Sequence, residues 1–285
     1  MPISDFPDRK YLIDPRELGE RLGEVTLIDL RPAEDFSLGH IEASKHLDIY
    51  GVSLNDSSDA PLNAFMAIFR TLFGARGVSQ DKPVVIYDHE SGERAARAVW
   101  LLAVMGHPDV KILDGGTRAW TASGKRLVGV KEAPAPVDPA VAPPTSPPFK
   151  ATPNLELLAT RFDVHRAIDD GDAVIVDVRR ESEYRGTERR ARRAGTIPRA
   201  VHIFWRDHLD GNGAFRPAEQ IRDLYASKGA TPDKTIIPVC HGGYRSASTF
   251  LALKSLGYPR VRNYVGAWGE WGNRDDSKIV IPEAT

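Results

Sequence analysis

The chain contains one sequence pattern twice, and this internal repeat limits the folds open to it. Residues 25–31 (VTLIDLR) match residues 173–179 (AVIVDVR), each a short apolar run that ends in Asp-x-Arg. Residues 84–88 (VVIYD) match residues 236–240 (IIPVC) in the same way. The chain has 285 residues, against a typical domain size of about 150 residues. Two copies of one fold are therefore expected, with a single core as the alternative.

A Pro-rich stretch separates the two copies. Residues 127–153 have neither helical nor strand periodicity, and proline favours extended backbone that lacks amide donors. We therefore expect a first domain at residues 1–126, a semi-rigid linker at 127–153 and a second domain at 154–285.

Within each copy, short β-branched runs alternate with amphipathic stretches. Apolar residues recur at helical spacing over 94–105 and over 246–256, and Gly106 and Gly257 stop these two segments. Alternating strands and helices predict an α/β fold in which a mostly parallel sheet is flanked by helices. Sites in such sheets form at the carboxyl ends of strands, where Asp88 and Cys240 stand.

Cys240 is the only cysteine of the chain, and it opens the loop CHGGYRS, residues 240–246. A strand that delivers a thiol into a Gly-Gly loop before a helix is typical of a thiolate nucleophile. The loop amides and the helix N-terminus would hold an anion there and favour the thiolate form. The alternative is a buried cysteine that acts as a small hydrophobic residue, and Gly242, Gly243 and Arg245 favour the nucleophile.

Charge and cysteine content narrow the function classes. The chain carries 38 basic and 39 acidic side chains, so no overall field favours nucleic acid or an anionic membrane. A single cysteine excludes an intramolecular disulfide framework and a cysteine-based zinc site. The N-terminus has no signal-peptide pattern, and no apolar run approaches the roughly 20 residues of a membrane span. We expect a cytoplasmic protein without a metal or a cofactor.

Three stretches resemble the tandem-domain rhodaneses, a family that includes thiosulfate sulfurtransferase and 3-mercaptopyruvate sulfurtransferase. They are residues 36–47 (FSLGHIEASKHL), the cysteine loop, and residues 261–271 (VRNYVGAWGEW). Glu42 stands where proline is usual in the family, and Val265 replaces a more polar residue. The resemblance implies two rhodanese-like domains. The first would be silent because Asp88 occupies the cysteine position, and the second would be catalytic.

The resemblance also implies a reaction. Thiolate Cys240 would attack the outer sulfur of a sulfane donor, and a persulfide would wait for a thiol or cyanide acceptor, with no cofactor. A thioredoxin-like reductant is a further candidate partner. His241, Gly242, Gly243, Tyr244 and Arg245 would form the substrate-binding loop.

Each of these loop residues has more than one interpretation. We expect His241 at the rim of the pocket rather than as a general base, and Tyr244 as a pocket wall. Arg245 would orient the donor's anionic group or brace the loop.

Residues outside the loop have weaker signals. Asp177 and Arg179 are expected to support the site. They are either a structural pair or take part directly in catalysis. Glu183 stands where sulfurtransferases often have an arginine, and Arg185 and Arg192 could compensate as substrate-binding residues. The basic run at 189–193 is otherwise a solvated loop.

Two tryptophans of the last signature, Trp268 and Trp271, are expected to pack in the core or between domains rather than to stack on substrate.

Rival functions remain at this point. Cysteine-dependent phosphatases and arsenate reductases use the same layout with one more residue between Cys and Arg, so the shorter loop here favours a single sulfur atom. A non-enzymatic persulfide carrier or regulatory module is a different class. Among donors, thiosulfate is favoured over 3-mercaptopyruvate because Arg245 places a cation close to the sulfur.

Overall fold

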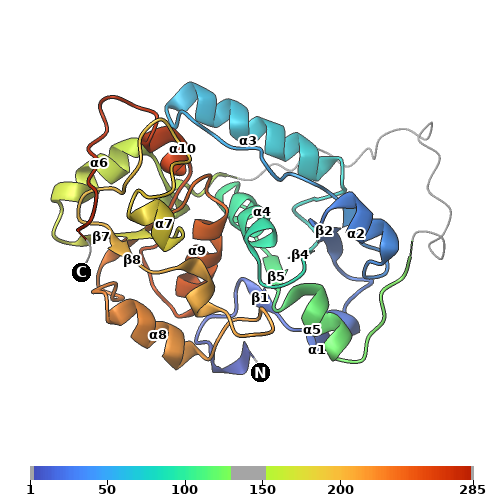
Figure 1. Cartoon of the computed structure of the whole chain (residues 1–285). Helices are drawn as coiled ribbons and strands as arrows, with labels where there is room; N and C mark the ends of the chain where they lie inside the picture. Colours follow the sequence, from blue (N-terminus) through green and yellow to red (C-terminus); the bar gives the residue numbers. More distant parts are fainter. Residues whose placement is uncertain (1–2, 130–151, 284–285) are drawn as a thin grey trace.

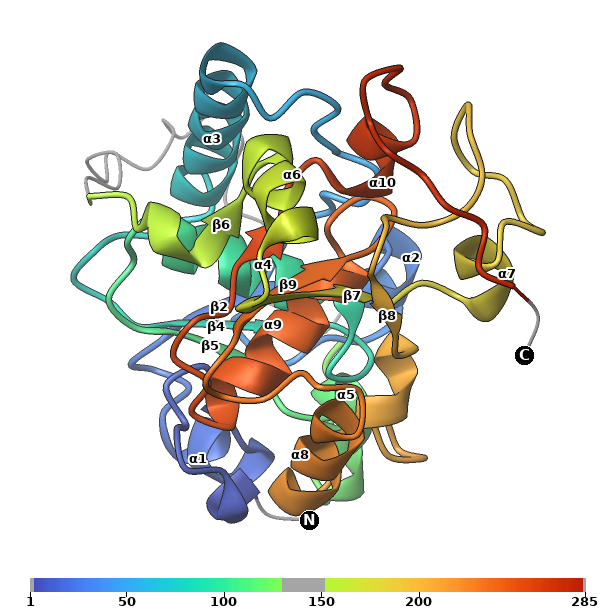
Figure 2. The same cartoon turned by 90° about the vertical axis from the view of Figure 1, so that its left-hand side faces the viewer.

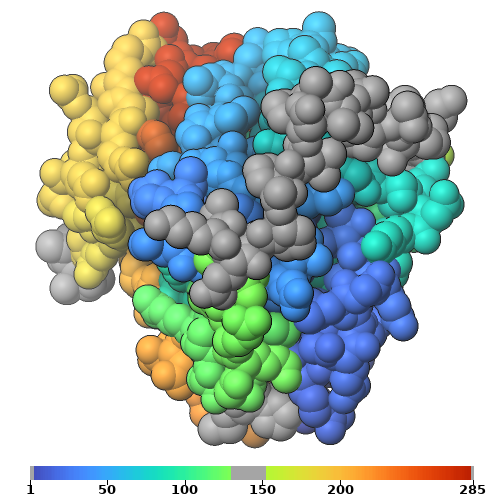
Figure 3. Space-filling view, turned by 90° about the vertical axis from the view of Figure 1, so that its right-hand side faces the viewer, coloured from blue at the N-terminus to red at the C-terminus, as the bar shows by residue number. Residues whose placement is uncertain are grey.

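The computed structural model describes residues 3–129 and 152–283, and it has two α/β halves that pack side by side (Figure 1). Figure 3 shows that blue to green residues of the first half form most of one face, with yellow to red residues of the second half along its left side. The two predicted copies of one fold are present.

The first half is built on a five-stranded sheet with the order β1-β5-β4-β2-β3. Its strands are β1 (Leu12–Ile13), β2 (Thr26–Asp29), β3 (Lys45–His46), β4 (Val84–Tyr87) and β5 (Val110–Leu113). Every neighbouring pair is parallel. Its helices are η1 (Ile3–Asp5), α1 (Pro15–Glu20), α2 (Ala33–Leu38), α3 (Asp59–Gly74), α4 (Glu93–Val104) and α5 (Gly116–Ala122). The central strands β2 and β4 are buried along their whole length, as in sheets covered on both faces.

The second half repeats this topology. Its strands are β6 (Leu158–Ala159), β7 (Ala173–Asp177), β8 (Val201–His202), β9 (Thr235–Val239) and β10 (Asn263–Tyr264). They pair as β8-β7-β9 and β10-β6, and a parallel bridge between Ile236 and Val261 brings the two groups together. The order β6-β10-β9-β7-β8 thus matches that of the first half.

Helices cover both faces of the second sheet. They are η2 (Leu155–Leu157), α6 (Arg161–Asp169), α7 (Glu181–Tyr184), η3 (Trp205–His208), α8 (Ala218–Ala226), α9 (Arg245–Ser255) and α10 (Ala267–Trp271). Figure 2 shows α6 and α9 on opposite sides of β7 and β9. No helix in the described part of the chain is long and apolar enough to cross a bilayer.

The predicted helices at 94–105 and 246–256 are α4 and α9, each one residue earlier than expected. Gly106 and Gly257 follow them with φ angles of 88° and 82°, the left-handed conformation that glycine adopts at helix ends. Both helices directly follow the strand and loop that carry Asp88 and Cys240, so they fix where these two loops lie.

The two halves share one core. Helices α4 and α9 pack against each other, and one cluster of buried side chains includes Trp100 of α4 and Phe250 of α9. Trp268 and Trp271 are buried in a second cluster, so their expected packing role is confirmed. Because the first of these clusters contains side chains of both halves, the halves support each other.

The chain ends of the halves interlock. Val128 exchanges two backbone hydrogen bonds with His40, so the first half extends past the expected boundary at 126. The Asp8 amide donates to the carbonyl of Ser255 in the second half, and the Asn154 amide donates to Val104 in the first. Most of the predicted linker, residues 130–151, lies outside the described residues.

Candidate active site

Cys240 directly follows β9, and its side chain is 1% exposed. The backbone amide of Gly243 donates to its Sγ at 3.1 Å, and the hydroxyl of Ser246 donates at 3.3 Å. Gly243 has a φ angle of 82°, which lets the loop turn tightly and aim this amide at the sulfur. Helix α9 begins at Arg245, so its positive N-terminal end faces the same atom. The loop is therefore a preformed cradle for an anionic sulfur.

Ser246 is a part of this cradle that sequence reasoning did not single out. Its position in the first turn of α9 was visible in the sequence, but its contact depends on how the helix starts.

Arg245 is held by Glu183 of α7 in a paired contact. Its Nη1 and Nη2 donate to the two carboxylate oxygens of Glu183 at 2.5 and 3.0 Å. Burial opposes the charged form of both groups, but their mutual hydrogen bonds raise the pKa of Arg245 and hold that of Glu183 below its usual value. This contact braces the loop, and the other role expected for Arg245, orienting the donor's anionic group, stays a prediction. The carboxylate that stands in place of an expected arginine is the partner of the loop arginine.

A cavity of about 780 Å³ opens beside Cys240 and is lined from both halves. The second half contributes Cys240, His241, Gly242, Tyr244, Arg245, Arg180, Glu188, Arg190, Phe204, Trp205 and Arg206, and the first half contributes Tyr50, Gly51, Ser53 and Glu93. Arg190 belongs to the basic run whose contact with substrate the sequence left open, whereas the first-half residues, Arg180 and Arg206 were not predicted. Their distance from Cys240 along the chain hid them.

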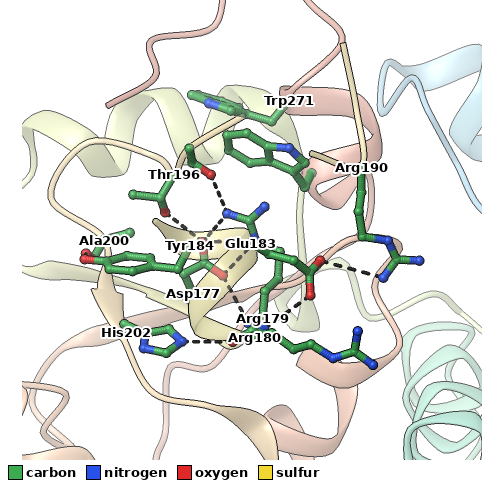
Figure 4. A network of polar contacts seen from close by, with 12 residues as sticks. Asp177, Arg179, Arg180, Glu183, Tyr184, Arg190, Thr196, Ala200, His202 and Trp271 are labelled. Carbon is green, nitrogen blue, oxygen red and sulfur yellow. Dashed lines mark hydrogen bonds and ion pairs between the residues drawn. The ribbon is translucent and has the colours of Figure 1, made fainter. Parts of the chain in front are cut away.

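Arg185 and Arg192 were predicted to bind substrate, but neither is among the described residues that line the cavity. Arg185 donates to Glu181 at 2.7 Å, and Arg192 pairs with Asp275. Both side chains are held by local carboxylates instead. Arg190 is the residue of the basic run that lines the cavity, and Figure 4 shows it directed at Glu183, 3.7 Å from the carboxylate.

Asp177 and Arg179 form a buried pair that supports the chain behind the site. The guanidinium of Arg179 donates to both oxygens of Asp177 (Figure 4). It also donates, at 2.7 Å, to the carbonyl of Gly195. Asp29 and Arg31 make the same contacts in the first half. Because the pair also occurs where no thiol is present, the geometry favours a structural role.

His241 and Tyr244 form walls of the cavity. Burial and the charge of Arg190 lower the pKa of His241, so its ring is neutral near pH 7, and the hydrogen bonds to Sγ come from Gly243 and Ser246 instead. The hydroxyl of Tyr244 donates to the carbonyl of Ile49 at 2.7 Å, which fixes it to the first half.

The corresponding loop of the first half holds its own anion. The carboxylate of Asp88 accepts hydrogen bonds from the amides of Glu90 at 2.9 Å and Ala95 at 3.1 Å. Burial raises the pKa of Asp88 to about 6. A Cβ on Gly92 would lie 2.6 Å from this carboxylate, so the side chain fills the loop. The amides that could receive a substrate anion are already used.

Residues 3–129 and 152–283 contain no cluster of three or more His, Cys, Asp or Glu side chains that could hold a metal ion.

A tandem α/β protein with one thiol loop and one carboxylate loop is the class that fold and site define. The family model described as the rhodanese-like domain matches residues 14–123 and 160–274. The chain therefore belongs to the rhodanese family and contains two copies of its domain.

Individual relatives cover nearly the whole chain. A thiosulfate sulfurtransferase of Pseudomonas aeruginosa is 35% identical over 98% of this chain and 100% of its own length. The sulfur carrier protein TtuD of Thermus thermophilus is 34% identical over 93% of this chain and 91% of its own. The crystal structure of SseA from Escherichia coli, described as a 3-mercaptopyruvate sulfotransferase, matches with a TM-score of 0.70 and 27% identity over 92% of this chain and 100% of that one.

Proposed function

We propose that this protein is a thiosulfate sulfurtransferase that works through a persulfide on Cys240. The observation that carries the proposal is the sulfur cradle, in which the Gly243 amide, the Ser246 hydroxyl and the start of α9 converge on one thiol beside an arginine-lined cavity. Such a cradle stabilises negative charge on sulfur before and after transfer.

The reaction needs two displacements at sulfur. The Cys240 thiolate attacks the outer sulfur of thiosulfate, the S–S bond of the donor breaks, and sulfite leaves with the bonding electron pair. The enzyme then holds a Cys240 persulfide anion. Cyanide or a thiolate attacks its terminal sulfur, and the Cys240 thiolate leaves and returns to the cradle.

Two features support thiosulfate as the donor. The charge of Arg245 lies in the loop next to the sulfur, where the oxygens of thiosulfate would be close, whereas a mercaptopyruvate carboxylate would need a bidentate arginine farther out. Arg185 and Arg192, the two candidates for that clamp, contact other carboxylates. The 35% identical relative is named for thiosulfate as well.

The physiological acceptor would be a thiol, with a thioredoxin-like reductant as one candidate. The cytoplasm is the location we propose, because a reducing compartment keeps a single thiol available for transfer.

Intact mass after incubation with thiosulfate tests the mechanism. We expect one added sulfur atom that cyanide removes, and Cys240→Ser should neither gain sulfur nor turn over. Ser246→Ala is the milder control, because it removes one donor to the sulfur and keeps the thiol. Appreciable transfer by Cys240→Ser would reject the persulfide.

Steady-state turnover with thiosulfate and with 3-mercaptopyruvate tests the donor. We expect a higher kcat/KM for thiosulfate. A value about tenfold higher for 3-mercaptopyruvate, which is roughly 1.4 kcal/mol of transition-state binding, would assign the other donor.

A further inference from the structure

Arg97 is a buried arginine at the interface of the two halves that the proposed reaction has not used. It lies in α4 of the silent half, and its side chain is 0% exposed. Its Nε, Nη1 and Nη2 atoms have no hydrogen-bond partner among the residues that the structure describes. Buried polar groups are almost always paired, and an arginine keeps its charge in proteins. An unpaired guanidinium in this position therefore needs an explanation.

The guanidinium points toward the catalytic loop. Its Cζ lies 3.8 Å from the centre of the Tyr244 ring, with the rings of Phe65 and Phe69 at 5.6 and 5.9 Å. Aromatic faces attract a cation, but they carry no net negative charge. Tyr244 stands four residues after Cys240 in the loop, so the cation is held against the loop that surrounds the sulfur.

As a thiolate, the Cys240 sulfur would supply a negative charge next to this cation. Burial lowers the pKa of Arg97, and the groups that oppose this effect are Tyr244 and Cys240. Both belong to the catalytic loop. No carboxylate among the described residues forms an ion pair with Arg97.

Each arginine of the cavity lies within 3.9 Å of a carboxylate, and Arg245 and Arg190 share one. Glu183 takes Arg245 at 2.5 Å and lies 3.7 Å from Arg190. Arg206 pairs with Glu90 at 2.6 Å.

The remaining charged or titratable groups near the loop add little positive charge. Arg180 has Glu188 at 3.9 Å. Burial lowers the pKa of His241, which favours its neutral ring. Burial raises the pKa of Glu93, which favours its neutral carboxyl form. Arg97 differs from the arginines of the cavity, because no carboxylate of the described residues pairs with it.

We propose that Arg97, supplied by the silent half, is the counter-charge of the Cys240 sulfur and stabilises its thiolate through the stacked Tyr244 ring. The part of this inference that concerns the persulfide rests on the proposed function. The part that concerns the thiolate does not, because it needs no sulfur donor. Arg97 is thus a positioning and electrostatic residue, and the silent half takes part in the chemistry.

Alkylation of Cys240 by iodoacetamide as a function of pH tests the inference, since the chain has one cysteine. Removing the cation destabilises the thiolate, so we expect Arg97→Met to move the midpoint of the pH profile upward by about one unit. That shift is a tenfold lower thiolate fraction below the midpoint, or about 1.4 kcal/mol. Arg97→Lys keeps the charge, so its midpoint should lie close to that of the wild type.

Arg94→Met is the matched control. Arg94 lies on the same helix and also stacks on a tyrosine, with its Cζ 4.0 Å from the Tyr50 ring, but it pairs with Asp48 at 3.4 Å. Its removal should leave the alkylation midpoint unchanged. A folded Arg97→Met with the midpoint of the wild type would overturn the proposal.

A second comparison covers the case in which Arg97→Met does not fold. Arg97→Gln is neutral and polar, and its midpoint should lie about one unit above that of Arg97→Lys. Equal midpoints for these two variants would also overturn the proposal. If the wild-type protein transferred no sulfur but the Arg97 variants showed these midpoint shifts, the proposed function would be rejected and the role of Arg97 retained.

Discussion

At the scale of single residues, the role of Glu183 follows from its ion pair with Arg245. The family resemblance led us to expect weaker donor binding, because a negative charge replaced an arginine. In the structure, this carboxylate is buried and accepts hydrogen bonds from Nη1 and Nη2 of Arg245. Its negative charge is therefore matched locally, and the loop arginine is fixed in place.

Glu183→Gln should weaken the fold and strengthen the binding of anions. Breaking a buried ion pair costs about 3 kcal/mol or more, so the urea midpoint should fall. The charges of Arg245 and Arg190 lose their carboxylate, so the KM for thiosulfate should fall severalfold. Glu188→Gln is the control, because Glu188 is more exposed and lies 3.9 Å from Arg180. A higher KM in Glu183→Gln would mean that Arg245 works only when Glu183 holds it.

His208 predicts a loss of stability in acid. It is fully buried between the Tyr225 hydroxyl at 3.1 Å and the Ser248 hydroxyl at 3.0 Å, and burial lowers its pKa from 6.5 to about 3. Between pH 6.5 and pH 3 the imidazole is therefore protonated in the unfolded chain but neutral in the folded one. The free energy of unfolding falls as the pH decreases through this range. The loss between pH 7.5 and pH 5 is roughly 2 kcal/mol.

Urea unfolding of wild type and His208→Gln at these two pH values measures this effect. The variant should be less stable at pH 7.5 and should lose about 2 kcal/mol less on acidification. Asp88 and Asp114 act in the opposite direction, because burial raises the pKa of each to about 6, but they are present in both proteins. Parallel losses in the two proteins would show that His208 is not the group responsible.

Sequence reasoning at this scale identified residues that are close along the chain. The loop from Cys240 to Arg245 is contiguous, so its strand, its glycines and the following helix could be predicted together. Arg190, Arg206 and Tyr50 reach the cavity from other elements. Arg185 was chosen because it follows Glu183 and Arg192 because it lies in the basic run, but side chains a few residues apart in such a segment point in different directions. Only the fold determines which of them faces the site.

At the scale of elements, the chain uses one strand-loop-helix unit twice with different side chains. The unit β4-loop-α4 binds the carboxylate of Asp88, and the unit β9-loop-α9 binds the sulfur of Cys240. The bounds of α4 and α9 were predictable because apolar periodicity and a terminal glycine agree. The packing of α4 against α9 was not predictable, because apolar residues on a helix do not indicate which neighbouring element they contact.

Asp88→Ala should separate stability from catalysis. Two buried amides, those of Glu90 and Ala95, lose their acceptor, and each costs about 1–3 kcal/mol when left unpaired. We expect a lower unfolding free energy and a kcat within about twofold of wild type. If a folded Asp88→Ala lost activity as completely as Cys240→Ser, the assignment of silent and catalytic halves would be wrong.

At the scale of the whole molecule, polar contacts join the halves in addition to the shared core. The buried carboxylate of Glu270 accepts from the Ser57 amide at 2.7 Å and from the Tyr264 hydroxyl at 2.8 Å. It thereby links the first half to the last signature of the second. Glu90 of the first half pairs with Arg206 of the second through two hydrogen bonds.

We therefore expect a single unfolding transition in urea, with coincident curves from far-UV circular dichroism and tryptophan fluorescence. Glu270→Gln should lower the midpoint of both curves equally, since its partners come from both halves. Two separable transitions in the wild type would contradict a shared core.

The hydroxyl of Tyr244, which bonds to the carbonyl of Ile49, also bears on how the protein is made. A growing chain emerges from its N-terminus, and domains tend to fold in that order. The half that carries Ile49 and Arg97 is synthesised before Cys240. Because the core of that half is completed by α9, which follows Cys240 in the chain, assembly of the reactive centre coincides with the last step of folding.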